Sequence, residues 1–351
     1  MPESFFELSQ KDQREALEYV RAETGRPAHL LEKDIWVVWT LRALFEAPIG
    51  SDLTFKGGTS LSKVYKIIDR FSEDIDLTYD IRRLIPDLTG ESGELPRSRS
   101  QAGKWTKAVR RRLPDWISAN IQPVLETALA KEGLQSRLEQ GGRDNDKLML
   151  HYPPLTKGTG YIAPVFTLEF GGRATGEPHE IQSVECDIAE HLTEIEFPTA
   201  SPQVMSLART FWEKATAAHV FCAQGRLRGE RYARHWHDLA AISRNEHYAA
   251  VISDHAIAST VAQHKSHFFI EKEMDGEIID YIAATRGKLK LVPGGNARTA
   301  LAKDYEAMMA DEVMVGDALP FDALLDVCAA IEATINESAA VNSLPGRAGL
   351  P

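Results

Sequence analysis

The sequence predicts an α+β protein with strands and helices mixed in its N-terminal part and mainly helices in its C-terminal part. Three segments between residues 147 and 188 alternate apolar and polar side chains, which is typical of half-buried strands. After Pro198 and Pro202, apolar residues recur at helical spacing. A chain of 351 residues is long enough for about two domains. We therefore expect a core with a mixed sheet and flanking helices at 1–200, a helical lobe at 201–340 and a disordered tail at 341–351.

The individual elements follow from apolar spacing and from chain-breaking residues. In residues 30–45, for example, Ile35, Val38 and Leu41 share one face of a helix, and Pro48 follows its end. The predicted elements before residue 200 are helices at 10–24 and 30–45, a strand at 53–56, a helix at 61–68, a strand at 74–79, a mobile loop at 86–103, helical segments at 104–112 and 114–139, and strands at 147–152, 165–170 and 181–188. The later ones are helices at 204–223, 230–243, 248–263, 299–309 and 321–337.

Composition and charge exclude several classes of protein. The chain is 43% hydrophobic and 26% charged, but it has no apolar run of about 18 residues that could span a membrane. Its N-terminus lacks the regions of a signal peptide, and its three cysteines are too far apart for a metal or disulfide framework. We therefore expect a cytoplasmic protein. A net charge of −11 argues against a surface that is generally basic and coats nucleic acid.

The central candidate site combines a glycine turn with two aspartates. Gly57 and Gly58 open a helix-compatible run, and Asp74 and Asp76 follow in a strand, where alternate residues share a face. Backbone N–H groups at such a turn bind phosphate, and paired carboxylates bind Mg²⁺. The alternative is a turn followed by a solvated acidic strand. Glu169, in a strand of similar pattern, is the candidate third acidic residue, with Glu185 and Asp187 as alternatives.

Two candidate residues lie in the helical part. Lys214 falls in the middle of an apolar helical stripe, so its ammonium either extends to solvent or binds a buried anion. Asp238 lies at the edge of another such stripe, where it would orient Lys214 or an active-site water.

A basic segment offers a candidate contact with RNA. Trp105 and Trp116 lie among its positive charges and would be available for base stacking. The alternative is a solvated helix face. The basic residues are Lys104, Lys107, Arg110, Arg111 and Arg112.

These motifs together resemble a known family. Gly57-Gly58-Thr59-Ser60-Leu61 and Arg70-Phe71-Ser72-Glu73-Asp74-Ile75-Asp76-Leu77 resemble the first motif of the AbiEii/AbiGii toxin family, which includes the MenT toxins. Residues 32–36 are similar to the family's N-terminal helix, and residues 168–173, 209–214 and 231–239 are similar to its later motifs, in the same order along the chain. The family belongs to the DNA polymerase β-like nucleotidyltransferase superfamily.

The resemblance implies a fold and an activity. It implies a bilobed protein, with a nucleotidyltransferase core followed by a helical lobe, that uses a nucleoside triphosphate and Mg²⁺ or Mn²⁺. The acceptor would be the 3′ end of tRNA, and the partner a cognate antitoxin encoded nearby. By motif, the resemblance implies functional roles for Gly58, Ser72, Asp74, Asp76, Lys214 and Asp238, with Glu169 as a third acidic residue. Together with the residue patterns, it predicts Asp74, Asp76 and Glu169 as metal ligands; Gly57, Gly58, Thr59, Ser60, Lys63, Ser72 and Lys214 as nucleotide-binding residues; and Asp74, Asp76, Lys214 and Asp238 as catalytic residues. The alternatives are nucleotidylation of a protein or small molecule, and a nucleotide-binding module without turnover.

Overall fold

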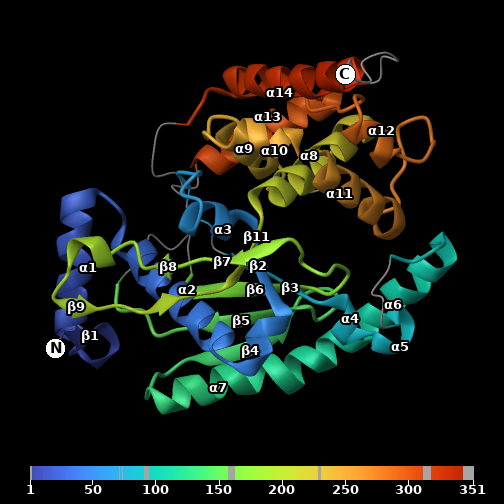
Figure 1. Ribbon diagram of the computed structural model, residues 1–351. Coiled ribbons are helices and arrows are strands. Elements are labelled where there is room, and N and C mark those ends of the chain that lie inside the picture. Colours follow the sequence, from blue (N-terminus) through green and yellow to red (C-terminus); the bar gives the residue numbers. More distant parts are fainter. Residues whose placement is uncertain are drawn as a thin grey trace, which may run out of the picture. The chain divides into compact units, whose positions relative to one another are not determined.

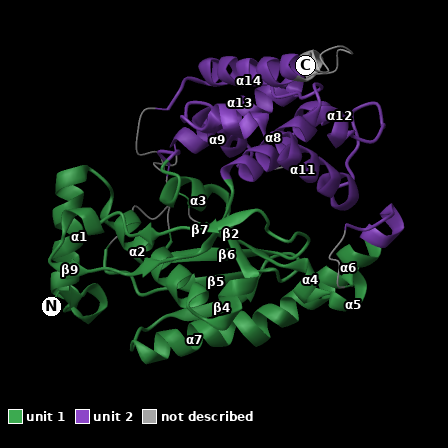
Figure 2. Ribbon diagram, in the orientation of Figure 1, with its two compact units in different colours: residues 1–66, 71–94, 103–206 green, residues 67–70, 95–102, 207–351 purple. Residues whose placement is uncertain are grey.

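The protein forms two compact units (Figure 2). Unit 1 comprises residues 1–66, 71–94 and 103–206, and unit 2 comprises residues 67–70, 95–102 and 207–351. The computed structural model describes residues 2–70, 72, 74–90, 95–156, 163–227, 231–310 and 318–342, without the side chains of 339–342. Residues 341 and 342 end the last helix, and the rest of the predicted tail lies outside the described residues. Among the described helices, none is long and apolar enough to cross a membrane.

Unit 1 begins with a capped helix and a core helix. In α1 (Gln10–Thr24), the Ser9 hydroxyl accepts a hydrogen bond from the Asp12 N–H, and Gly25, with φ 75°, ends the helix in the left-handed conformation. Helix α2 (Ala28–Phe45) is buried along most of its length, including Trp36 and Trp39. A helix that is buried all round belongs to the interior, so α2 forms part of the core of unit 1.

A seven-stranded mixed sheet, counted over the described residues, forms the centre of unit 1 (Figure 1). Its spatial order is β4 (Arg137–Gly141), β5 (Lys147–His151), β6 (Val165–Gly171), β3 (Asp74–Tyr79), β2 (Leu53–Lys56), β11 (Gln203–Met205) and β7 (His179–Ile181). The β3–β6 and β2–β11 pairs are parallel and the other pairs are antiparallel. The predicted α+β fold with a mixed sheet is therefore confirmed.

Shorter elements complete unit 1. Two small sheets pair β1 (Glu3–Ser4) with β9 (Ile195–Glu196) and β8 (Val184–Glu185) with β10 (Thr199–Ala200). The short helices are η1 (Phe5–Glu7), η2 (Pro48–Asp52), α3 (Gly57–Lys63), α4 (Ile81–Leu84), α5 (Pro86–Thr89) and η4 (Ala189–His191).

The two faces of the sheet differ in chemistry. On β3, Ile75 and Leu77 are fully buried, whereas Asp74 and Asp76 on the opposite face are half-buried. Helices α2, α6 (Arg99–Trp116) and α7 (Gln122–Lys131) cover the apolar face (Figure 1). The rings of Trp116 and Tyr79, for example, stack with centroids 3.8 Å apart. The other face, which we call the acidic face, carries Asp74 and Asp76.

Several elements differ from the prediction, for reasons of local geometry. Helix α3 begins at Gly57, four residues early, because this glycine makes the turn itself at φ 82°. The predicted helix at 114–139 is divided: α6 runs through Pro114, a π-helical turn (Ile117–Ile121) follows, and α7 ends at Lys131. Gly133, with φ 66°, then breaks the helix before β4 pairs with β5. The predicted loop at 86–103 contains α5 and the start of α6, and the strand at 181–188 is divided between β7 and β8.

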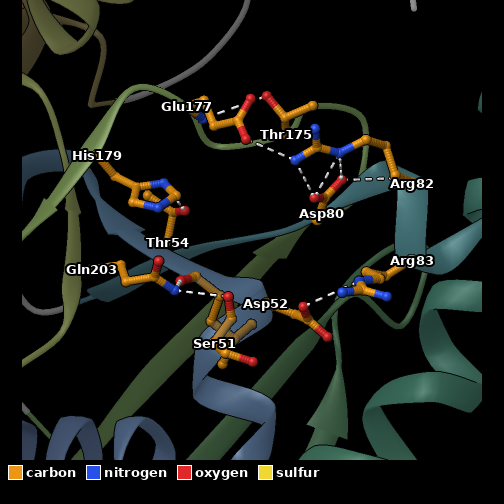
Figure 3. Close-up of polar contacts among 11 residues, drawn as sticks. Ser51, Asp52, Thr54, Asp80, Arg82, Arg83, Thr175, Glu177, His179 and Gln203 are labelled. Carbon is orange, nitrogen blue, oxygen red and sulfur yellow. Dashed lines mark hydrogen bonds and ion pairs between the residues drawn. The ribbon is translucent and has the colours of Figure 1, made fainter. Parts of the chain in front are cut away.

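A polar cluster fixes the strand ends opposite Asp76 (Figure 3). In the antiparallel register of β2 and β3, Leu53 pairs with Tyr79 and Lys56 with Asp76, so Asp52 and Asp80 lie at the far end. Arg82 bridges Asp80 and Glu177 at 2.6 and 2.8 Å. The Gln203 amide donates to backbone carbonyls of residues 50, 51 and 53. These bonds tie β11 and the segment before β7 to the strands at the centre of the sheet.

Unit 2 is helical after residue 206. Its helices are α8 (Leu207–Gln224), α9 (Ala233–Ile242), α10 (Tyr248–Ser253), α11 (His255–Phe268), α12 (Tyr281–Thr285), α13 (Gly295–Ala310) and α14 (Phe321–Asn342). The predicted helix at 248–263 is interrupted at Asp254, whose carboxylate accepts from the Ile257 N–H and starts α11. Helix α8 contacts α9 and α11 and so lies centrally in this unit.

The buried His219 should make the stability of unit 2 depend on pH. Its Nδ1 accepts a hydrogen bond of 3.0 Å from the Lys290 N–H, and burial, with the Lys290 charge, lowers its pKa to about 4. The unfolded chain, with an ordinary His pKa of about 6.5, binds this proton more tightly, so stability is lost as pH falls from 6.5 towards 4. We expect this residue to lower the free energy of unfolding by about 2 kcal/mol between pH 7 and pH 5.

Urea denaturation of the wild type and His219→Gln at pH 7 and pH 5 measures this contribution. The glutamine keeps a hydrogen-bond acceptor but does not titrate. The free energy of unfolding of the variant should therefore change less between pH 7 and pH 5, by about 2 kcal/mol. The exposed His247 serves as a control when replaced by glutamine. Equal pH dependence in wild type and His219→Gln would contradict the assignment.

Candidate active site

Three carboxylates share the acidic face of the central strands. In the parallel register of β3 and β6, Asp76 pairs with Glu169 and Asp74 pairs with Thr167. Paired residues on neighbouring strands project from the same face. Glu169 therefore neighbours the aspartate pair, as the alternation of the two strands predicts.

A lysine on the next strand balances part of this negative charge. Lys147 on β5 pairs in register with Glu169, and its ammonium donates to the Glu169 carboxylate. Burial alone would lower the pKa of Lys147, but the hydrogen bond and charge of Glu169, with a contribution from Asp74, raise it. The acidic face thus attracts a cation, and Lys147 supplies one from within the chain.

The glycine turn packs directly against one aspartate. Gly57 has φ 82°, and a Cβ atom there would lie 2.0 Å from Oδ2 of Asp76. The Thr59 hydroxyl donates to the Asp74 carbonyl, and the Ser60 hydroxyl donates to the Gly57 carbonyl at 2.9 Å. The turn and β3 therefore form one unit in which the absence of a side chain at Gly57 sets the position of the Asp76 carboxylate.

The other turn residues are enclosed. Gly58, Thr59, Ser60 and Ser72 are buried, and the Thr59 hydroxyl also lies 3.4 Å from the Ser72 carbonyl. Because the Thr59 hydroxyl donates to Asp74 and the Ser60 hydroxyl to Gly57, backbone N–H groups are the groups that the turn could offer to phosphate.

The alternatives for the third acidic residue lie elsewhere. Glu185 is exposed on β8, in a two-stranded sheet that is separate from β3. Asp187 accepts from the Lys63 ammonium at 2.7 Å and pairs with Arg26. Of the three candidates, Glu169 is the one that the sheet places beside Asp76.

Lys63 does not have the position that nucleotide binding would need. Its side chain is 5% exposed, and its ammonium lies 2.6 Å from Asp34 and 2.7 Å from Asp187. Burial would lower the pKa of Lys63, but the charges of these carboxylates raise it. We correct the predicted role: Lys63 anchors α3 to α2 and to the segment after β8.

The donor set fits a divalent metal through the aspartate pair. Carboxylate oxygens are the ligands that Mg²⁺ and Mn²⁺ prefer, and Gly57, without a side chain, allows the Asp76 carboxylate to pack against the turn. In the described part of the chain, no group of three or more histidine, cysteine or acidic side chains is placed to hold a metal ion. Glu169 is paired with Lys147, so Asp74 and Asp76 are the residues that would hold the ion.

Removing the competing ammonium should strengthen divalent cation binding. We expect Lys147→Met to increase Mn²⁺ affinity by about fivefold, because a partly exposed ion pair contributes up to about 1 kcal/mol. Titration with Mn²⁺, followed by electron paramagnetic resonance, measures the affinity. Lys131→Met, an exposed lysine at the end of α7, is the matched control. An unchanged affinity in Lys147→Met would show that Lys147 does not compete with the ion.

The second set of candidate residues forms a buried cluster within unit 2. Asp238 on α9 is fully buried, and the Lys214 ammonium from α8 lies 2.9 Å from its Oδ2. Arg70 donates to both oxygens of the same carboxylate, from Nε at 3.0 Å and from Nη2 at 2.9 Å. His237 Nδ1 lies 3.2 Å from Oδ1. The Lys214 side chain is 12% exposed, so its ammonium is held by Asp238 instead of extending freely into solvent.

Electrostatics fix the charge states of this cluster. Burial opposes ionisation of Asp238, but the charges of Arg70 and Lys214 hold its pKa well below the usual range. Burial and the Lys214 charge lower the pKa of His235 to about 3, so that ring is neutral at physiological pH. Arg70 and Lys214 therefore share one carboxylate, which leaves an excess of one positive charge.

The basic segment on α6 is only partly available to RNA. Lys104, Lys107, Arg110 and Arg111 are exposed, although Arg110 lies 3.5 Å from Asp144. Arg112 is bound by both carboxylate oxygens of Asp87.

The predicted availability of Trp105 for base stacking is wrong, and Trp116 is already stacked within the protein. Trp105 is 4% exposed, and Trp116 stacks on Tyr79. A helix that covers a sheet turns its aromatic residues inwards, so Trp105 belongs to the core of unit 1, whereas Trp116 is half-buried against the sheet.

Arg70 and Lys147 have site positions to which the sequence assigned no role. A signal for Arg70 is its place in the first motif, four residues before Asp74. For Lys147, the alternation of its strand is a signal. Its pairing with Glu169, however, depends on the register of β5 and β6, which only the structure gives.

Comparisons with known proteins assign the chain to a family. A family model described as "Nucleotidyl transferase AbiEii toxin, Type IV TA system" matches residues 39–327. A search of curated proteins gives no match. Among solved structures, MenT4, a nucleotidyltransferase toxin from Mycobacterium tuberculosis H37Rv, is 17% identical, with a TM-score of 0.43 and coverage of 97% of this chain and 91% of that chain. JHP933 from Helicobacter pylori is 12% identical, with a TM-score of 0.42 and coverage of 90% and 94%. The family match spans most of the sequence, and the chain belongs to the AbiEii family of nucleotidyltransferase toxins of type IV toxin–antitoxin systems.

Proposed function

We propose that the protein transfers a nucleotide from a nucleoside triphosphate to the 3′ end of tRNA, releases pyrophosphate and so blocks translation. The observation that carries the proposal is the acidic face of β3, where Asp74 and Asp76 lie beside a glycine turn that packs against Asp76. Membership of the AbiEii family supports nucleotidyl transfer as the reaction class.

Each candidate residue has a proposed role. Asp74 and Asp76 would hold Mg²⁺ or Mn²⁺, which when bound would neutralise phosphate oxygens. Backbone N–H groups of the Gly57–Ser60 turn would bind phosphate oxygens. Lys214, oriented by Asp238, is the proposed phosphate ligand of unit 2. The acceptor hydroxyl would attack the α-phosphate, and pyrophosphate would leave.

The proposed acceptor is RNA because unit 1 carries an exposed row of basic residues. Lys104, Lys107, Arg110 and Arg111 are exposed on α6, in a chain whose net charge is −11. Such a local patch can contact phosphates without making the whole surface basic. The proposed biological partner is an antitoxin encoded nearby, as the type IV description of the family suggests.

Labelled nucleotides test the reaction and the acceptor together. The full chain is incubated with Mg²⁺, each α-³²P nucleoside triphosphate and total tRNA, beside the Asp74→Ala variant. We expect label in tRNA with the wild type and none with the variant. Label that appears in a protein or a small product would show that the acceptor is not tRNA. Nucleotide binding without pyrophosphate release would indicate a binding module and would contradict the proposed enzyme.

A further inference from the structure

The Arg70 guanidinium has one donor that the protein leaves unused. Arg70 is 4% exposed, and its Nε and Nη2 both bind Asp238. Among the described residues, its Nη1 is buried and has no hydrogen-bond partner. A buried guanidinium donor without an acceptor is costly, so such a group usually meets a ligand or an ordered water.

The charges around Arg70 indicate what kind of ligand would use that donor. Asp238 is the carboxylate that binds both Arg70 and Lys214, and its oxygens already accept from both cations. The neighbouring His235 is neutral because of its lowered pKa of about 3. The site therefore holds two cations against one carboxylate, and an anion would balance the charge.

We infer that Arg70 is a second cationic ligand, beside Lys214, for a polyphosphate chain such as the triphosphate of a nucleotide. The inference rests on the proposed function, which it deepens by adding a residue to the phosphate site. Planar guanidinium donors match phosphate oxygens well, and charge-assisted hydrogen bonds of this kind are the strong ones. Asp238 would hold both cations in place while the ligand accepts from Nη1 of Arg70 and from the Lys214 ammonium.

Binding of inorganic tripolyphosphate tests the inference apart from catalysis. Isothermal titration calorimetry of the full chain, in buffer that contains EDTA, needs neither metal nor nucleotide transfer. We expect Arg70→Gln to weaken binding by about tenfold or more, and Arg70→Lys to weaken it less because it keeps the charge. The matched control is Arg42→Gln, which removes another arginine whose carboxylate partner, Glu132, is bound through both oxygens.

A double variant separates ligand binding from a role in holding Asp238. If Arg70 acted only through Asp238, Arg70→Gln would have no effect in an Asp238→Asn background. We expect it to weaken tripolyphosphate binding there as well. If Asp238→Asn does not fold, the comparison of Arg70→Gln with Arg70→Lys decides, with folding checked by circular dichroism.

The outcomes are distinct from those of the proposed function. Wild-type affinity in a folded Arg70→Gln variant, or no tripolyphosphate binding by the wild type, would overturn the inference. Absence of nucleotide transfer, with binding that still depends on Arg70, would contradict the proposed function and leave the polyphosphate site standing.

Discussion

Replacing Gly57 with alanine is expected to reduce nucleotide transfer by about 100-fold or more. The new Cβ would lie 2.0 Å from Oδ2 and 2.8 Å from Cγ of Asp76, so the carboxylate must move. A displacement of about 1 Å in a catalytic constellation can cost 100-fold in rate. Alanine at φ 82° also adds backbone strain of about 1–3 kcal/mol. Transfer rates and urea denaturation measure the two effects separately.

Gly25→Ala is the matched control for the backbone effect. Gly25 has φ 75°, and a Cβ there would meet nothing within 4 Å. This variant should lose stability in a similar way while keeping its transfer rate. If both variants lost activity only in proportion to stability, the contact between Gly57 and Asp76 would have no role in the site.

The second large effect is expected from Lys214→Met. Methionine keeps the packing on α8 but removes the ammonium that binds Asp238 at 2.9 Å. We expect the transfer rate to fall by about 100- to 1,000-fold, the loss typical of removing one preorganised charge-stabilising group. The fold should persist, because Arg70 still binds both oxygens of Asp238.

Single-turnover measurements with saturating nucleotide test this effect. Lys290→Met, in the same unit, removes an exposed ammonium that lies 3.3 Å from Glu273 and should leave transfer unchanged. Wild-type transfer by the Lys214→Met variant would show that Lys214 has no role in the reaction.

The strands that carry the site can be predicted from the sequence, whereas the ion pairs within the site cannot. Alternation in 74–79 and 165–170 places Asp74, Asp76 and Glu169 on polar faces, because burial of the intervening residues dictates this pattern. The residue-to-residue register of β3 and β6 arises from long-range pairing, and it is this register that aligns Glu169 with Asp76. Local spacing contains no information about that alignment.

The mistaken assignments have the same physical origin. Lys63 follows the glycine turn closely enough to suggest a phosphate ligand, but Asp34 and Asp187, both distant in sequence, bind its ammonium. Trp105 looks available because charges surround it in the sequence, yet it is buried. In both cases, tertiary packing decides the role, and the residues next to it in the sequence do not show that packing.

The central claim is that the acidic face of β3 supports nucleotidyl transfer, and comparison of two labels tests it most directly. The full chain is incubated with Mg²⁺ and acceptor RNA, using α-³²P or γ-³²P nucleoside triphosphate, beside Asp76→Asn. We expect the α-label in RNA and the γ-label in pyrophosphate with the wild type, and neither product with the variant. Transfer of the γ-label to the acceptor, or equal transfer by Asp76→Asn, would contradict the claim.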